Sequence, residues 1–185
     1  PGGWDAVQAR LGQAYAELGE TRKAIDYYDQ ALSVICKMGD RKNEGALLGC
    51  LGQAYAELGE THKAIDYYNQ ALFIACETGD RRNEGAGLGN LGSVYANLGK
   101  TREAMKYYKH ALVISRDIGD RNGEGEDLRN LGHSYANLGE IRKAIEYYDQ
   151  ALDIAREVGD RRNQGVAMGS LGMTYADLGE IRKAI

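Results

Sequence analysis

The chain has 185 residues, a formal net charge of −4 and 27% charged residues, a composition without the basic excess of nucleic-acid-binding proteins. It contains no signal-peptide pattern and no apolar run of the roughly 20 residues that cross a bilayer, so we expect a cytoplasmic protein without a membrane partner.

One nine-residue pattern returns every forty residues along the chain. It reads LGQAYAELG from Leu11 and from Leu51, LGSVYANLG from Leu91, LGHSYANLG from Leu131 and LGMTYADLG from Leu171. A period of this length predicts a stack of small units, none of which buries its apolar face alone. We expect a single array over residues 1–185, with repeats at about 4–39, 40–79, 80–119 and 120–159 and a truncated repeat at 160–185.

Each repeat is predicted to contain two helices, an A helix followed by a B helix. The first A helix covers about 4–19 and the first B helix about 20–38. Apolar residues three and four apart place one face of this B helix at Ala24, Ile25, Tyr28, Ala31, Leu32 and Ile35. The same pattern predicts later A helices near 40–58, 80–98, 120–138 and 160–178, and later B helices near 60–78, 100–118 and 140–158. Residues 180–185 would begin a fifth B helix.

Glycine and aspartate mark the predicted helix ends. Gly39 follows the first B helix, where a left-handed backbone closes a helix, and Asp40 can cap the next helix by accepting backbone N–H bonds. Within the A helix, Gly52 lies where a side chain would hold the paired B helix away. The tyrosines are interpreted as core and stacking residues, because neighbouring helices satisfy the whole apolar pattern.

The second repeat carries a family resemblance, and the equivalent positions of the other repeats share it. The order and intervals are those of the tetratricopeptide repeat at Leu48, Leu51, Gly52, Tyr55, Gly59, Ala64, Tyr68 and Ala71. The chain therefore resembles this family over its whole length, with six residues (79–84, GDRRNE) added to the usual unit of about 34. Such forty-residue units are similar to those of Pins/LGN-type adaptors and of the sensor arrays of bacterial nucleotide-switch proteins.

The resemblance implies an all-α fold, an α-solenoid of about four and a half units. These antiparallel helical hairpins would form a right-handed superhelix whose concave wall, lined by A helices, binds an extended peptide or a partner helix.

The helical wheel places this wall on the A-helix face opposite Leu51 and Tyr55. The candidate groove residues are Gln53, Asn90, Ser93, Asn97, Arg129, Asn130, His133 and Asn137. Carboxamides both donate to and accept from a peptide backbone, which favours binding of main chain; alternatively, these are solvated helix positions. Arg129 either contacts a carboxylate or carbonyl of the partner or pairs in water with Glu126. The wall carries more acidic than basic residues, so we expect a neutral to mildly basic protein or peptide partner.

No arrangement of residues predicts catalysis, a cofactor or a metal site. The GxGxxG match at 87–92 lies in the middle of a predicted helix and follows no strand. The three cysteines lack CxxC spacing; Cys36 and Cys76 are interpreted as packed at B-helix ends, and Cys50 as a groove residue. The arginines of the GDRRNE-type segments alternate with acidic residues and are interpreted as solubilising the edge of the stack.

Three functions remain open from the sequence. The first is a protein–protein interaction scaffold that uses the A-helix groove. The second is a structural solenoid that self-associates end to end, because Ile181 and Ile185 of the unfinished fifth repeat lack their usual cover. The third is a sensor arm of a larger nucleotide-switch protein.

Overall fold

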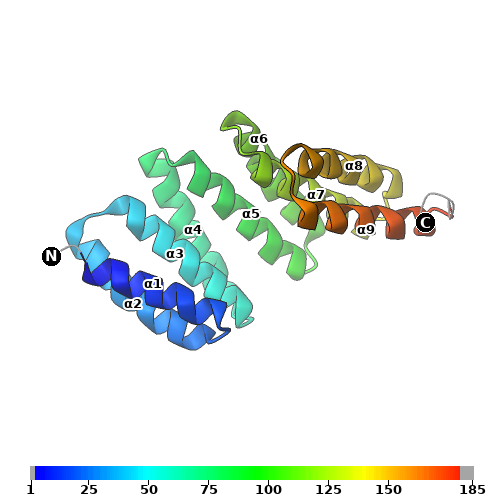
Figure 1. Cartoon of the computed structure of the whole chain (residues 1–185). Helices are drawn as coiled ribbons and strands as arrows, with labels where there is room; N and C mark the ends of the chain where they lie inside the picture. The colour runs from blue at the N-terminus through cyan, green and yellow to red at the C-terminus, as the bar shows by residue number, and fades with distance from the viewer. Residues whose placement is uncertain (1–2, 180–185) are drawn as a thin grey trace. The chain divides into compact units, whose positions relative to one another are not determined.

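The computed structural model describes residues 3–179, without the side chain of Trp4, and these residues form nine α-helices and no strand (Figure 1). The A helices are α1 (Trp4–Glu17), α3 (Arg41–Glu57), α5 (Arg81–Asn97), α7 (Arg121–Asn137) and α9 (Arg161–Asp177). The B helices are α2 (Thr21–Met38), α4 (Thr61–Thr78), α6 (Thr101–Asp117) and α8 (Ile141–Glu157). Every predicted helix is confirmed to within two residues at each end. The expected fifth B helix, with Ile181 and Ile185, lies outside the described residues.

Consecutive helices pack on one another in two compact units, unit 1 (Pro1–Val94) and unit 2 (Tyr95–Ile185). In unit 1, α1 packs on α2, α2 on α3 and α3 on α4; in unit 2, α6 packs on α7, α7 on α8 and α8 on α9. This sequential hairpin packing confirms the all-α repeat fold. The hand of the superhelix and a single array over 1–185 stay predictions. None of the described helices has an apolar stretch that could cross a bilayer.

The turns follow the predicted pattern of glycine and aspartate. Gly39 ends α2 with a φ of 72°, in the left-handed region that favours glycine. Asp40 then begins α3, and its side chain accepts a hydrogen bond from the backbone N–H of Asn43 at 3.2 Å. Asp120 and Asp160 cap α7 and α9 in the same way. The residues that repeat most strictly therefore fix where each helix stops and starts.

A glycine within each of several A helices makes room for a tyrosine of its own B helix. A Cβ placed at Gly52 would lie 2.6 Å from Cδ1 of Tyr68, closer than carbon atoms approach in proteins. The same contact occurs between Gly12 and Tyr28 in the first repeat. The prediction that this glycine permits close helix packing is confirmed, and the group that comes close is the tyrosine ring.

A second tyrosine of each B helix stacks on a tyrosine of its A helix. The ring centroids lie 5.1–5.2 Å apart in all four such pairs, which are Tyr15–Tyr27, Tyr55–Tyr67, Tyr95–Tyr107 and Tyr135–Tyr147. A lysine ammonium lies over each A-helix ring, for example Lys63 at 4.8 Å from the Tyr55 centroid. These contacts confirm that the tyrosines are stacking residues first.

The interpretation of Cys36 and Cys76 as packed residues was wrong, whereas the interpretation that the GDRRNE-type arginines solubilise the edge of the stack stays a prediction. Cys36 and Cys76 are exposed, because they lie on the outer side of the last turn of their B helices. The first arginine of the GDRRNE-type segment joins helix ends: Arg41 at the start of α3 bonds Glu77 near the end of α4, with Nη2 and Oε2 2.5 Å apart. Arg121 and Glu157 make the equivalent pair in unit 2. In these two repeats, the added segment thus ties the start of the A helix to the end of its own B helix.

Candidate functional site: the A-helix faces

An open cavity of about 400 Å³ lies between α1 and α3 in unit 1. Its lining consists of Gln13, Ala16 and Glu17 from α1, Cys50, Gln53, Ala54 and Glu57 from α3, and Tyr28 from α2. The two A helices contribute equivalent residues of the first two repeats, and these belong to the face on which the sequence predicts the wall. In these two repeats, the predicted face borders a real concavity.

A second cavity of about 270 Å³ continues along the same two helices toward their N-terminal ends. It shares Gln13, Tyr28 and Cys50 with the first cavity and adds small and polar groups that include Ala6, Ala9, Arg10 and Ala46. We call the two together the unit-1 groove. The small side chains make its walls shallow, as the rows of alanine and glycine in the sequence predict.

Paired glutamine and glutamate side chains flank the unit-1 groove. Gln13 Nε2 donates to Glu17 Oε1 at 3.2 Å, and Gln53 Nε2 donates to Glu57 Oε1 at 3.1 Å. These bonds hold each carboxamide beside its helix and leave its carbonyl oxygen free to accept a hydrogen bond. All four side chains belong to exposed residues, so a ligand can reach them.

Tyr28 forms the floor of the unit-1 groove. The residue is only 5% exposed, and burial raises its pKa to about 12, with further contributions from its neighbour Cys50 and from the carboxylates of Glu57 and Glu17. Burial also raises the pKa of the Cys50 thiol. Both groups are therefore neutral near pH 7, and Cys50 is not an activated nucleophile.

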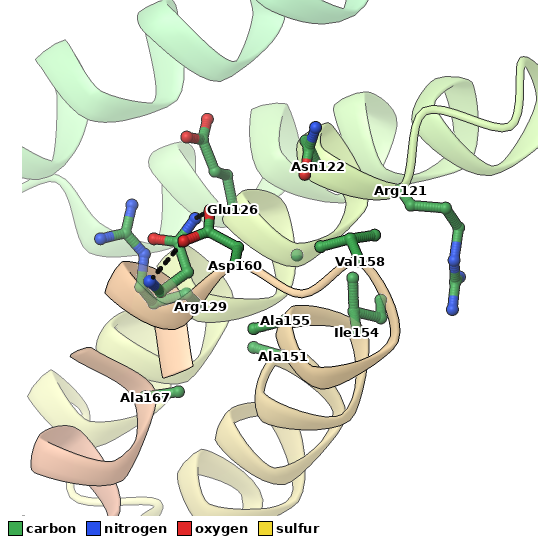
Figure 2. A pocket seen from close by; sticks show the side chains of 12 residues that line it. Arg121, Asn122, Glu126, Arg129, Ala151, Ile154, Ala155, Val158, Asp160 and Ala167 are labelled. Carbon is green, nitrogen blue, oxygen red and sulfur yellow. Dashed lines mark hydrogen bonds between the residues drawn. The ribbon is translucent and has the colours of Figure 1, made fainter. Parts of the chain in front are cut away.

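In unit 2, the same face carries a cation. Arg129 lines a small cavity of about 20 Å³ between α7, α8 and the start of α9 (Figure 2). Its Nε is buried without a hydrogen-bond partner, and among the described residues it forms no ion pair. The alternative of a surface pair with Glu126 is therefore wrong. Arg121 also lines this cavity, but it is paired with Glu124 and Glu157.

His133 lies one helical turn after Arg129 and contacts the buried Tyr148 of α8. His133 Nδ1 and Tyr148 Oη are 2.8 Å apart, with the rings edge to face. Burial and the positive charge of Arg129 lower the pKa of His133 below its ordinary value. The imidazole is thus neutral at pH 7, and the cationic group on this part of α7 is the guanidinium of Arg129.

The other predicted groove residues lie on A helices as expected, with differing access. Gln53, Asn90, Asn97, His133 and Asn137 are exposed, whereas Ser93, Arg129 and Asn130 are partly buried. Ser93 Oγ donates to the carbonyl of Gly89 at 3.1 Å, within its own helix. Only Gln53 lines the unit-1 groove, and Arg129 lies near His133 in unit 2. The set as one binding site stays a prediction.

Gln13, Glu17 and Glu57 line the groove but are not among the groove residues predicted from the sequence. Sequence reasoning also missed Tyr28 as a groove residue, because the heptad-like apolar spacing of α2 assigns Tyr28 to the core. The available signal was Gly12, since the absence of a side chain there lets the Tyr28 ring lie against α1.

A family model for the tetratricopeptide repeat matches residues 6–77, 43–117, 83–157 and 127–185. The chain belongs to the tetratricopeptide repeat family. Tetratricopeptide repeats are in general protein-interaction domains and usually have no catalytic function. A comparison with curated protein sequences gives no significant match.

Several solved tetratricopeptide structures share the fold. The crystal structure of BtubC from P. vanneervenii has a TM-score of 0.84 and 23% identity, over 94% of this chain and 72% of that chain. A Rap protein complexed with competence and sporulation factor has a TM-score of 0.82 and 21% identity, over 96% of this chain and 50% of that one.

A signal-transduction ATPase with a tetratricopeptide repeat sensor, from Pyrococcus horikoshii, has a TM-score of 0.87 and 25% identity. The match covers 97% of this chain and 28% of the archaeal protein. The chain thus corresponds to half of the Rap protein and to a smaller part of the ATPase.

Proposed function

We propose that this chain is a protein–protein interaction scaffold that binds an extended peptide segment of a partner on its A-helix faces. The observation that carries the proposal is the unit-1 groove, which is open, about 400 Å³ in its larger part, and flanked by equivalent glutamines of two successive repeats. Gln13 and Gln53 offer carbonyl oxygens on the two sides of the groove, and these can accept hydrogen bonds from the amides of an extended main chain.

In unit 2, the proposed contacts are polar and cationic. Arg129 is partly buried and, among the described residues, forms no ion pair, so its guanidinium would bind a carboxylate or carbonyl oxygen of the partner. Asn130 is partly buried beside it on α7. The Rap protein that shares this fold is complexed with competence and sporulation factor, which supports a binding role for arrays of this shape.

The test is a selection of peptides followed by substitutions in the groove. Peptides from a random dodecamer phage library are selected on the full chain, and the affinity of the best one is measured by calorimetry. We expect Gln13→Ala combined with Gln53→Ala to weaken binding about tenfold, which corresponds to ~1.4 kcal/mol of lost hydrogen bonding. Gln30→Ala is the matched control, because Gln30 is an exposed glutamine on the B helix α2.

Two results would contradict the proposal. One is that no peptide is selected although the chain is folded, as checked by circular dichroism. The other is that peptides bind equally well to the groove variant, to the Gln30→Ala control and to a variant with Asn90, Arg129 and Asn130 changed to alanine.

A second candidate is the sensor arm of a larger nucleotide-switch protein. It is favoured by the similarity to the archaeal ATPase, whose sensor is a tetratricopeptide array. The sequence of the parent gene tests it: a nucleotide-binding domain next to the array supports this role, and an array without one removes it.

A further inference from the structure

The larger cavity of the unit-1 groove has an uncompensated negative charge. Its eight lining residues include Glu17 and Glu57 and no lysine, arginine or histidine. The adjoining smaller cavity differs, because Asp5 there is accompanied by Arg10. The negative charge is therefore confined to the half of the groove between the C-terminal ends of α1 and α3.

The lysines near the A-to-B turns of these two hairpins, Lys23 and Lys63, are paired with other carboxylates. Lys23 pairs with Glu20 and lies over the Tyr15 ring, and in the next repeat Lys63 pairs with Glu60 at 2.6 Å. Each lysine is thus held at its own A-to-B turn. Glu17 and Glu57 instead accept hydrogen bonds from the neutral amides of Gln13 and Gln53, and Glu57 accepts a second one from the Thr21 hydroxyl at 3.4 Å.

Both carboxylates act on the floor of the cavity. Glu57 and Glu17 each raise the pKa of Tyr28, in addition to the larger effects of burial and Cys50. The negative charges of two glutamates on different helices therefore act on the same buried hydroxyl. A cation that entered the cavity would meet both of them at once.

The remaining lining suits the apolar stem of a basic side chain. Ala16 and Ala54 line the cavity between the two carboxylates, and the ring of Tyr28 lies below them. Long basic side chains place their methylene groups on such surfaces while the charged end reaches polar groups. At about 400 Å³, the cavity exceeds the space of ten water molecules at roughly 30 Å³ each, so a side chain has room to enter.

We propose that the cavity between Glu17 and Glu57 receives a lysine or arginine side chain of the bound peptide. The ammonium or guanidinium donates charge-assisted hydrogen bonds to the two carboxylates, and its stem lies on Ala16 and Ala54. This inference rests on the proposed peptide-binding function and adds the chemistry that one subsite selects. It places a basic residue of the partner beside the first two repeats.

The test is a double-mutant cycle on the full chain with a selected peptide. The protein variant is Glu17→Gln with Glu57→Gln, and in the peptide each lysine is replaced by norleucine and each arginine by citrulline, one at a time. We expect one basic residue whose replacement weakens binding to the wild type about tenfold and leaves binding to the glutamine variant unchanged. The control is Glu20→Gln with Glu60→Gln, which removes the same charge from outside the cavity.

The outcomes separate this inference from the proposed function. Peptides that depend on Gln13 and Gln53 but contain no basic residue would overturn the inference alone. The same conclusion follows if the effects of the peptide and glutamate changes simply add, or if the control variant loses as much affinity as the Glu17/Glu57 variant. A failure to select any peptide, or no dependence on Gln13 and Gln53, would overturn the proposed function itself.

Discussion

A buried carboxylate between α6 and α7 makes the stability of unit 2 dependent on pH. Asp127 is 6% exposed, and its Oδ2 accepts a hydrogen bond from Ser115 Oγ, 3.0 Å away. The equivalent positions at the next interface hold Ala155 and Ala167, which are apolar. Burial raises the pKa of Asp127 to about 7, opposed by the Ser115 bond and assisted by the negative charges of neighbouring acidic residues, which are Glu126, Asp120 and Glu124.

The sign follows from comparing the folded and unfolded states. An unfolded aspartate has a pKa of about 3.9, so between pH 4 and 7 the folded chain holds a proton that the unfolded chain has released. The stabilisation by protonated Asp127 is fully present below pH 4 and is lost as the pH rises through 7. At 1.36 kcal/mol per pKa unit, it amounts to about 4 kcal/mol, of which about 2.5 kcal/mol disappears between pH 5 and pH 8.

The informative variant combines Ser115→Ala with Asp127→Ala, because it reproduces the Ala155 and Ala167 pair found between α8 and α9. Urea unfolding is followed by circular dichroism at pH 5, 6, 7 and 8 for the variant and the wild type. We expect the free energy of unfolding of the variant minus that of the wild type to increase by about 2–3 kcal/mol as the pH rises from 5 to 8. The control is Glu146→Gln, an exposed carboxylate on α8 that is not among the groups acting on Asp127. A difference in unfolding free energy that stays constant across this range would refute the reasoning.

Two further predictions concern single residues. Gly52→Ala places a methyl group 2.6 Å from the Tyr68 ring and should destabilise unit 1 by about 1–3 kcal/mol in urea unfolding. Its control is Gly49→Ala, which meets no atom within 4 Å and should stabilise unit 1 by up to about 1 kcal/mol. Equal effects of the two substitutions would contradict the packing argument. Arg129→Ala removes a buried donor without a partner and should stabilise unit 2 by about 1 kcal/mol. It should also raise the pKa of His133 in an NMR titration, because the positive charge of Arg129 lowers that pKa. A lower pKa of His133 in the variant would exclude this interaction between Arg129 and His133.

Much of the fold could be predicted because the forty-residue period shows the same local rules several times. Gly39 and Asp40 mark a helix end by backbone chemistry alone, and this does not depend on what lies nearby in space. The pairing of Arg41 with Glu77 could not be predicted in this way, because it requires knowing which helix ends meet across 36 residues. Cys36 was misplaced for a related reason: an apolar stripe shows which face is buried but not where along the helix burial stops.

The site was only partly predictable, because a groove needs a floor as well as walls. The walls belong to the A helices, and their facing residues, such as Gln53, follow from the helical wheel. The floor belongs to a B-helix tyrosine, Tyr28, whose ring lies close to α1 because Gly12 has no side chain. The small size of the cavity beside Arg129 likewise depends on how α8 and α9 meet α7.

Some positions that depart from strict repetition carry buried polar groups, and these groups lower the stability of the fold. The scaffold needs the caps, the glycines and the stacked tyrosines, and these recur in nearly every repeat. Arg129 and Asp127 are not required for that scaffold, since the same positions hold glycine or alanine in the fifth repeat. Both place a polar group where burial penalises it, and both lie on α7 in unit 2. An anion bound at Arg129 would offset one of these penalties, and a proton on Asp127 offsets the other. The stability of unit 2 should therefore respond both to an anion bound at Arg129 and to a change of pH.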